Sequence, residues 1–232
     1  MEDHMADHIL VFDVNETLLD LTTLEPLFAR LFGDRAMMRQ WFANLILYSE
    51  AMTLSGEYAP FGTLAQGTLR MMGETQGVTV GDADTAELVH LLTNMPACDD
   101  VIPALTRLQE AGVRMVTLTN SPPTASPTPM EKAGIAHFFE AHYSVQSVGK
   151  FKPHPDCYRL VSESLGVHIA SLCLVAAHLW DTMGAQGAGA SGAFITRAGN
   201  AMLPSDGIAQ PTYVAPDLGA FADQWLALQD IV

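Results

Sequence analysis

The sequence predicts an α/β protein, a doubly wound parallel sheet with an all-helical insertion, from three observations. Short apolar segments of strand length alternate with helical patterns from about residue 100 onward, which is typical of a parallel sheet covered by helices. One further strand-like segment stands near the N-terminus. Between it and residue 96 the apolar residues follow only helical spacing. We therefore expect a core of residues 1–21 and 97–232 and a helical cap of residues 22–96.

The first strand is expected at 8–14, HILVFDV, because a nearly continuous apolar run is typical of a strand buried on both faces of a sheet. Thr22 and Glu25 have the spacing of a capping box, which predicts a helix that begins there and ends at Gly33. Helical spacing predicts three further helices, at 36–54, at 60–72 with an end at Gly73, and at 84–95. No comparable strand pattern interrupts them.

The second part of the chain alternates between the two kinds of element. Helical patterns occur at 100–112, 154–166, 181–189 and 217–230, and strand patterns at 114–120, within 142–149, at 171–176 and at 192–196. The proline-rich segment 121–129 predicts a loop that delays the next helix. The glycine-rich segment 184–193 lacks the GxGxxG spacing of a nucleotide-binding loop, so we interpret its glycines as sites of close helix packing.

Composition excludes several classes of function. The chain has 232 residues, 49% of them hydrophobic, and its apolar runs are too short to cross a bilayer. A net charge of −15 disfavours binding to nucleic acid or to anionic membranes. The acidic N-terminus, MEDHMADH, does not have the pattern of a signal peptide, and the three cysteines are widely spaced without a CxxC motif. We therefore expect a cytoplasmic protein without a disulfide or zinc framework.

Polar residues gather where the predicted strands end. They are Asp13, Asn15, Glu16 and Thr17 after the first strand, Thr119 and Asn120 after the second, Lys150 and Lys152 after the third, and His178 and Asp181 after the fourth. In an open parallel sheet, ligands bind in the crevice beyond the carboxyl ends of the strands. The sequence therefore predicts an active site there, formed by carboxylates, a hydroxyl group and a lysine.

Four segments, FDVNETLLD, TLTNS, KFKPHPDCY and LVAAHLWDTMGAQGAG, resemble the haloacid dehalogenase superfamily, and most closely its type II 2-haloacid dehalogenase group. The resemblance extends in order and spacing over essentially the whole chain, the helical cap included. It implies a Rossmann-like core, a small anionic haloacid as substrate and no cofactor. Dimers are common in such proteins, so the resemblance is also compatible with a homodimer.

Two residues distinguish the chain from the phosphatases of that superfamily. Those enzymes carry a second aspartate two residues after the nucleophile, which protonates the leaving group, whereas this chain has Asn15, which cannot donate a proton as a general acid. They also bind magnesium through an aspartate four residues before the equivalent of Asp181, where this chain has Ala177. Both differences fit a substrate without phosphate and a leaving group that needs no proton, such as halide. We therefore expect no metal.

The resemblance also implies roles for the site residues. Asp13 would attack the halogen-bearing carbon and form an aspartyl ester that water then hydrolyses. Lys152 would neutralise the site and keep Asp13 ionised, and Asp181 would pair with Lys152. Substrate contacts would come from Thr17, Thr119, Asn120 and Tyr158.

Other positions depart from the group's pattern. The cap arginine that grips substrate is replaced by Phe42; Arg39 lies one helical turn away and could substitute for it, while Phe42 and Trp180 suit an aromatic pocket wall. Glu16 and His178 stand where the group has glycine and asparagine. Because their loops follow neighbouring strands, we hypothesise that Glu16 orients His178, which activates the hydrolytic water. A purely structural role for His178 stays open.

Two further functions also stay open at this point. One is another hydrolysis reaction of the same superfamily, such as a phosphatase acting on a small metabolite. The other is a non-catalytic role in binding a small carboxylic acid, suggested by the missing cap arginine.

Overall fold

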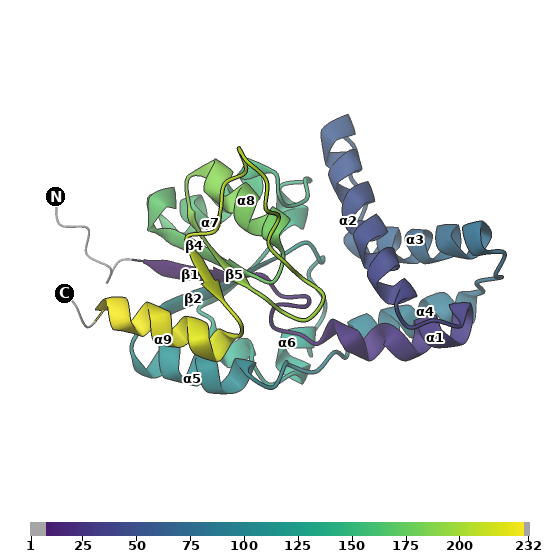
Figure 1. Cartoon of the computed structure of the whole chain (residues 1–232), viewed down its shortest axis with the longest axis horizontal. Coiled ribbons are helices and arrows are strands. Elements are labelled where there is room, and N and C mark those ends of the chain that lie inside the picture. Colours follow the sequence, from purple (N-terminus) through teal and green to yellow (C-terminus); the bar gives the residue numbers. More distant parts are fainter. Residues whose placement is uncertain (1–7, 230–232) are drawn as a thin grey trace.

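The fold is a six-stranded, fully parallel sheet with helices on both faces (Figure 1). The computed structural model describes residues 8–229, so predictions for residues 1–7 and 230–232 lie outside the described residues. The strands are β1 (Ile9–Phe12), β2 (Arg114–Thr119), β3 (Ala141–Ser144), β4 (Leu172–Ala176), β5 (Ser191–Ile195) and β6 (Tyr213–Ala215). Their spatial order is β3-β2-β1-β4-β5-β6. This confirms the predicted doubly wound sheet.

The direction of the chain across the sheet changes between β1 and β4, which are neighbours at its centre. The chain moves outward from β1 through β2 to β3, returns to β4, and continues outward through β5 to β6. At such a switch point the loops after the two strands leave a crevice beyond their carboxyl ends. Phe12 of β1 lies beside Val175 of β4, so Asp13 and the loop that contains His178 emerge at the same edge.

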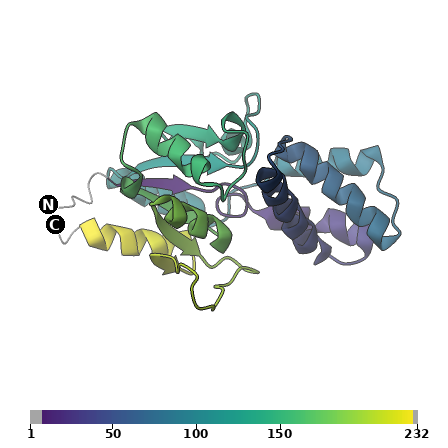
Figure 2. The ribbon, with the colours of Figure 1, turned by 90° about the horizontal axis from the view of Figure 1, so that it is seen from above.

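Helices cover the two faces of the sheet as separate pairs (Figures 1 and 2). The first pair is α5 (Val101–Glu110) with α9 (Leu218–Gln229), and the second is α7 (Pro155–Leu165) with α8 (Leu179–Ala188). Within residues 8–229, no helix combines the length and the apolarity that crossing a membrane requires.

Every described element between β1 and α5 is helical. These elements are the 3₁₀ helix η2 (Leu21–Leu24), α1 (Glu25–Phe32), α2 (Met37–Ser55), α3 (Phe61–Gln76) and α4 (Asp82–Leu92). Figure 2 shows them to one side of the sheet, with α2, in dark blue, nearest to it. This is the expected inserted cap, whose boundaries at 21–22 and 96–97 remain predictions.

The two linkers between core and cap run side by side. Asp20 donates its backbone N–H to the carbonyl of Pro96 at 2.8 Å, and Cys98 donates its own to the carbonyl of Leu18 at 2.9 Å. A backbone bridge between Leu19 and Ala97 lies between these bonds. Pairing satisfies polar backbone groups that would otherwise be buried near the base of the cap.

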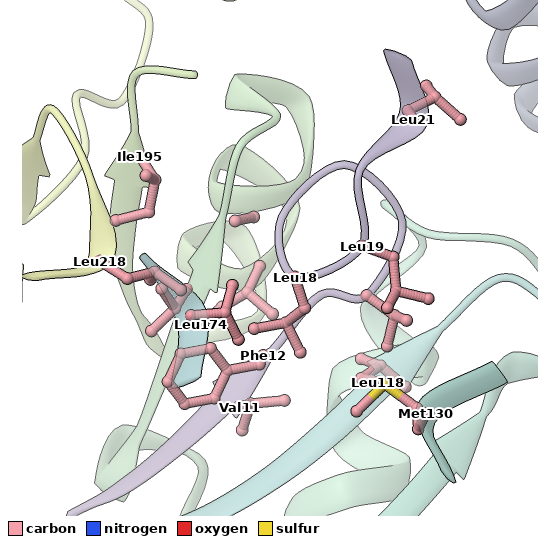
Figure 3. Packing of buried hydrophobic residues seen from close by; sticks show 14 of the residues in the cluster. Val11, Phe12, Leu18, Leu19, Leu21, Leu118, Met130, Leu174, Ile195 and Leu218 are labelled. Atoms are coloured by element: carbon pink, nitrogen blue, oxygen red, sulfur yellow. The ribbon is translucent and has the colours of Figure 1, made fainter. Parts of the chain in front are cut away.

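The core is built around β1, whose four residues are all buried. Figure 3 shows Val11 and Phe12 of β1 among apolar side chains from the neighbouring strands and from the loop after β1, including Leu18 and Leu174. Burial on both faces explains why the sequence of β1 is continuously apolar instead of alternating. It also fixes the strand that carries Asp13.

Two details of the predicted cap helices are wrong. Asp20, not Thr22, caps the first helical segment, because the Asp20 carboxylate accepts a bond from the Thr22 backbone N–H at 2.9 Å and η2 precedes α1. Helix α3 continues past Gly73 to Gln76. Gly73 is required for packing instead: a Cβ atom there would lie 2.7 Å from the Val78 carbonyl oxygen.

Several short elements were not predicted, among them strand β6 and helix α6. Strand β6 has three residues, too few to show a two-residue period, and pairs with β5 at the sheet edge. Helix α6 (Pro129–Lys132) has four residues, of which Pro129 belongs to the proline-rich segment that was expected to be a loop. Its capping box, Thr128 with Glu131, is present in the sequence as a signal.

Candidate active site

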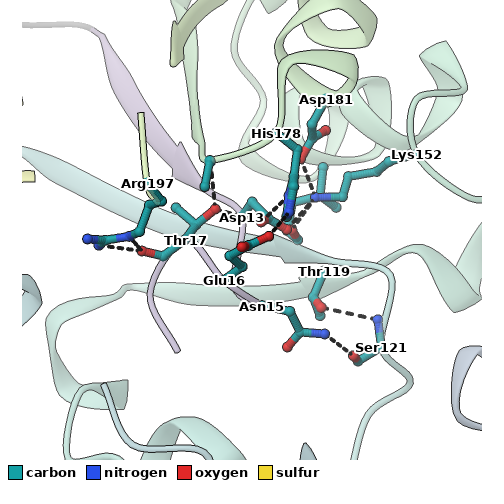
Figure 4. A network of polar contacts seen from close by, with 12 residues as sticks. Asp13, Asn15, Glu16, Thr17, Thr119, Ser121, Lys152, His178, Asp181 and Arg197 are labelled. Carbon is teal, nitrogen blue, oxygen red and sulfur yellow. Dashed lines mark hydrogen bonds and ion pairs between the residues drawn. The ribbon is translucent and has the colours of Figure 1, made fainter. Parts of the chain in front are cut away.

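Asp13 lies directly after β1, at the carboxyl edge of the sheet, and is 5% exposed. Its backbone N–H is held by the Val175 carbonyl of β4 at 3.0 Å, which extends the β1–β4 pairing by one step. Lys152 Nζ contacts Asp13 Oδ1 at 2.8 Å, and the Thr17 hydroxyl donates to Oδ2 at 2.7 Å (Figure 4). Both oxygens are therefore oriented by donors from different loops.

Lys152 is fully buried and its ammonium group has three acceptors. Besides Asp13, these are Asp181 Oδ2 at 2.6 Å and the Leu118 carbonyl at 3.1 Å. The Asn120 side-chain oxygen accepts the Lys152 backbone N–H at 3.0 Å and so positions the loop that carries it. Three donors of an ammonium meeting three acceptors satisfies the hydrogen-bonding requirement of a buried lysine.

The charges of this cluster are strongly coupled. Burial alone would raise the pKa of Asp13, but Lys152 and His178 outweigh it and hold that pKa below its ordinary value of 3.8. Burial alone would lower the pKa of Lys152, yet Asp13 and Asp181 raise it above its ordinary value of 10.5. Asp13 is therefore an ionised carboxylate next to a permanent positive charge at neutral pH.

The Asp181 carboxylate is also bonded to Tyr158. Burial raises the pKa of Asp181 above 3.8, and the charge of Lys152 offsets only part of this shift. The Tyr158 hydroxyl donates to Asp181 Oδ1 at 2.6 Å and contacts the Asp181 carbonyl at 3.0 Å. Burial raises the pKa of Tyr158 well above 10.0, so the phenol keeps its proton and acts as a donor. The Tyr158 hydroxyl thus bonds to Asp181 and not to Asp13.

Thr17 connects Asp13 to the segments that follow β4 and β5. Its hydroxyl, which donates to Asp13, also accepts the backbone N–H of Ala177 at 2.9 Å. Its carbonyl accepts bonds from Arg197 Nη2 at 2.8 Å and Nε at 3.2 Å. Arg197 also contacts Asp100 Oδ1 at 2.9 Å, in the segment that leaves the cap. Arg197 was not predicted; with Lys and Arg totalling only 11, its position just after a strand was the available signal.

Glu16 and His178 are brought together as hypothesised. His178 Nε2 lies 2.7 Å from Glu16 Oε2, and both side chains are buried. His178 Nδ1 lies 3.4 Å from Asp13 Oδ2 and has no hydrogen-bond partner among the described residues. Glu16 adopts a φ of 68°, in the left-handed region that rarely suits a residue with a side chain. A strained backbone at a chemical site is a recurrent sign of function.

Aromatic side chains hold the imidazole ring of His178. Trp180 stacks on it with ring centroids 5.2 Å apart, and Phe42 from the cap helix α2 contacts it at 5.3 Å. Lys152 Nζ also lies 5.9 Å from the centre of the Trp180 ring. Phe42, at the position expected for an arginine, therefore contributes an apolar contact. Arg39 instead pairs with Glu16.

Thr119 and Asn15 belong to a neighbouring network on the β2 side (Figure 4). Asn15 Nδ2 donates to the Ser121 hydroxyl at 3.2 Å, and the Ser121 N–H donates to the Thr119 hydroxyl at 3.1 Å. Neither side chain bonds to Asp13 among the described residues. Among residues 8–229, no group of three or more His, Cys, Asp or Glu side chains is arranged to hold a metal ion.

The helix after His178 approaches the site closely at a glycine. A Cβ atom at Gly184 of α8 would lie 2.5 Å from the Tyr158 hydroxyl oxygen and 2.8 Å from the Pro153 carbonyl oxygen. Both distances are shorter than real Cβ contacts allow. The interpretation of the glycine-rich segment as a site of close helix packing therefore holds at this position.

The geometry combines a buried aspartate after the first strand with a lysine from a later loop, and a helical cap is inserted directly after the aspartate loop. This combination is the one expected for a hydrolase with an inserted cap. The sequence matches the family model described as "haloacid dehalogenase-like hydrolase" over residues 8–189. The chain belongs to this family, as the resemblance of its four motifs indicated.

Relatives within the family are 2-haloacid dehalogenases. The (S)-2-haloacid dehalogenase of Xanthobacter autotrophicus is 29% identical over 81% of this chain and 74% of its own length. Haloacetate dehalogenase H-2 of Moraxella sp. (strain B) is 24% identical over 91% of this chain and 94% of its own length. The solved structure of the X. autotrophicus L-2-haloacid dehalogenase with chloropropionic acid covalently bound covers 93% of this chain and 96% of that chain, with 26% identity and a TM-score of 0.82.

Proposed function

We propose that this protein hydrolyses short 2-haloalkanoic acids to 2-hydroxy acids and halide, through an ester on Asp13. The observation that carries the proposal is the buried Asp13–Lys152 ion pair at the switch point of the sheet. It provides an ionised carboxylate whose oxygens are oriented and partly shielded from water. The covalently bound chloropropionic acid in the X. autotrophicus relative supports a covalent route.

In the first step, an oxygen of Asp13 attacks the carbon that bears the halogen. A carbon–oxygen bond forms as the carbon–halogen bond breaks, and the halide leaves with the bonding electron pair. No proton is transferred, which agrees with an asparagine at position 15. Lys152 remains paired with Asp181 when Asp13 loses its charge, so the ammonium keeps a buried partner.

In the second step, water attacks the carbonyl carbon of the Asp13 ester. His178 accepts one proton from this water, and Glu16 stabilises the resulting imidazolium. Lys152 lies where it can stabilise the oxyanion that forms on Asp13. As the intermediate collapses, the bond from the former ester carbon to the substrate oxygen breaks, and this oxygen takes the proton from His178 to give the 2-hydroxy acid. Asp13 then loses the remaining proton of the water to solvent and is a carboxylate again.

The reaction is tested by halide release from chloroacetate, bromoacetate, fluoroacetate and both enantiomers of 2-chloropropionate, with EDTA present. We expect EDTA-resistant release from at least one substrate, and none from Asp13→Asn. No release from any haloacid, together with magnesium-dependent cleavage of phosphate esters, would replace the proposal with a phosphatase.

The proposal includes a place of action. The cysteines Cys98, Cys157 and Cys173 are free thiols, and burial raises the pKa of Cys157 to about 12 and of Cys98 to about 11. Unreactive free thiols suit a reducing compartment, so we place the enzyme in the cytoplasm.

A further inference from the structure

The cap reaches the active site through Arg39, in the first turn of α2. Its guanidinium group pairs with Glu16 Oε1 in the loop after β1. It also donates to the backbone carbonyl of Ala198, in the loop after β5, at 2.8 Å. One cap side chain therefore joins two core loops that are far apart in sequence.

Gly199 and Ala198 together form the seat of Arg39, which is the backbone surface that its guanidinium group packs against. A Cβ atom at Gly199 would lie 3.1 Å from Arg39 Cζ and 3.2 Å from both Nε and Nη2. The guanidinium therefore packs flat against backbone that carries no side chain. Gly199 has a φ of 88°, so the seat also depends on a backbone conformation that favours glycine.

Glu16 links Arg39 to His178, because its carboxylate bonds to both side chains. One Glu16 oxygen is taken by Arg39 and the other by His178 Nε2. An ionised Glu16 accepts a proton-bearing Nε2. While Asp13 is ionised, its charge favours a proton on the neighbouring Nδ1 as well. Once Asp13 is esterified and neutral, Nδ1 is the nitrogen that carries the lone pair of His178. Nδ1 is the buried nitrogen 3.4 Å from Asp13 Oδ2 and without a hydrogen-bond partner in residues 8–229. This is the tautomer in which His178 can accept a proton beside the Asp13 ester.

Without Arg39, Glu16 would be a buried carboxylate whose remaining side-chain partner within residues 8–229 is the imidazole. Such a group can relieve its burial by taking up a proton, since an uncompensated buried charge is costly. A protonated Glu16 would donate to Nε2 and shift the His178 proton to Nδ1, which removes the base. Loss of Arg39 therefore changes a tautomer as well as a contact.

We propose that Arg39 is a positioning residue that couples closure of the cap to the tautomer of His178. The inference rests on the proposed function and adds to it: ester hydrolysis becomes competent only when α2 is seated on the core. Phe42, one turn further along α2, contacts the same imidazole ring at 5.3 Å. The cap thus determines which nitrogen of His178 carries the proton, through Arg39 and Glu16, and holds the plane of the ring, through Phe42.

The direct test uses ¹⁵N-labelled histidine side chains, because ring nitrogen shifts distinguish a protonated from an unprotonated nitrogen. The chain has 8 histidines, and His178 is assigned by the signals lost in His178→Asn. All spectra are recorded in the Asp13→Asn background, because its neutral side chain has the charge of the esterified aspartate. With Arg39 present we expect an unprotonated Nδ1 and a protonated Nε2. With Arg39→Gln we expect these two states to exchange or to mix. The cap stays docked in this variant through Phe151, whose N–H donates to Thr53 of α2 at 2.9 Å.

A pair of glycine variants separates the seat from the charge of Arg39. Gly199→Ala displaces the guanidinium but keeps it in the protein. Gly207→Ala is the matched control, because Gly207 lies in the same loop with a φ of 81° and a Cβ atom there would have no neighbour within 4 Å. We expect the histidine signature of Arg39→Gln in Gly199→Ala and the signature of the Asp13→Asn background alone in Gly207→Ala.

The kinetic readout is the balance between ester formation and ester hydrolysis. We expect Arg39→Gln and Gly199→Ala to release a burst of halide and then turn over on the order of 10²-fold more slowly, a typical contribution of a general base. Intact-protein mass should show the ester accumulating. Unchanged histidine signals with a raised KM and no ester would overturn the inference and make Arg39 a substrate contact. If the wild type releases no halide, the proposed function fails, while the histidine spectra still decide the role of Arg39.

Discussion

Lys152 lies between two buried carboxylates, Asp13 and Asp181, and compensates for both. Lys152→Met would leave them facing each other without a counter-charge. Removing one partner of a buried ion pair costs about 3–5 kcal/mol, so we expect a loss of that size in the free energy of unfolding and no ester formation. Urea denaturation measures the first effect and intact-protein mass the second.

Lys150 provides the control two residues away. It pairs with Asp156, but its side chain is 39% exposed. Exposed pairs contribute about 0–1 kcal/mol, so Lys150→Met should change the free energy of unfolding by less than about 1 kcal/mol. Equal losses in the two variants would show that burial of the Lys152 cluster is not what makes it important.

The lowered pKa of Asp13 predicts how ester formation depends on pH. Because the pKa of the folded state lies below 3.8, Asp13 stays ionised from neutral pH down to that value, and protonation stops the attack only below it. The single-turnover rate of ester formation should therefore show no decline between pH 7 and about pH 4. Rapid quenching and mass spectrometry measure this rate, with circular dichroism to confirm that the protein remains folded. A decline centred near pH 6 would contradict the predicted charge state.

His178 should act in hydrolysis of the Asp13 ester and not in formation of that ester. We expect His178→Asn to form the ester and to hydrolyse it about 10²- to 10⁴-fold more slowly, because asparagine cannot accept the proton from water. The measurement is the mass of the intact protein after mixing with a haloacid. An unmodified mass with unchanged turnover would return His178 to a structural role.

At the scale of elements, helix α8 contains both Asp181, which bonds to Tyr158, and Gly184, which packs against the same tyrosine. Gly184→Ala would place a methyl group 2.5 Å from the Tyr158 hydroxyl, which could move away only by breaking its bond to Asp181. Overpacking of this kind costs about 1–3 kcal/mol. We expect that loss in thermal or urea unfolding, together with slower turnover as Asp181 is displaced.

Gly187→Ala is the control that separates the Gly184–Tyr158 contact from a general effect of adding a side chain to α8. Gly187 lies in the same helix, and a Cβ atom there would have no neighbour within 4 Å. Gly187→Ala should be neutral or stabilising by up to about 1 kcal/mol, because alanine has the higher helix propensity. Destabilisation of similar size in both variants would mean that α8 resists any added side chain.

The elements that the sequence predicted well are those with a long, regular pattern. The apolar run of β1 and the helical spacing of α2 and α7 are properties of the local sequence, so they could be recognised without tertiary contacts. Strand β6 could not, because three residues carry no period and are ordered by pairing with β5.

The same distinction holds within the candidate site. The proximity of Glu16 and His178 follows from strand order, which alternation of elements already predicts. The partner of Arg39 depends on how the cap sits on the core, and no local pattern encodes that placement. Arg197 acts mainly on the backbone carbonyl of Thr17, a contact that side-chain types do not reveal.

At the scale of the whole molecule, the net charge of −15 acts on the approach of an anionic substrate. A surface of this sign repels a haloacid carboxylate before any local donor can bind it. Salt shortens the range of this repulsion, from a Debye length of about 30 Å at 0.01 M to about 8 Å at 0.15 M. We therefore expect kcat/KM to rise with ionic strength, by less than about tenfold, while kcat stays constant.

A non-halide salt such as sodium sulfate is required for this measurement, because added halide would compete as product. Whether kcat/KM rises or falls with ionic strength decides between two electrostatic descriptions. A rising kcat/KM means that the global charge governs encounter, with Arg39 held by Glu16 and unable to attract substrate from a distance. A falling kcat/KM would mean that local cations at the cap–core boundary steer the substrate in. Arg39 would then have to leave Glu16 during encounter, and the salt slope should disappear in Arg39→Gln.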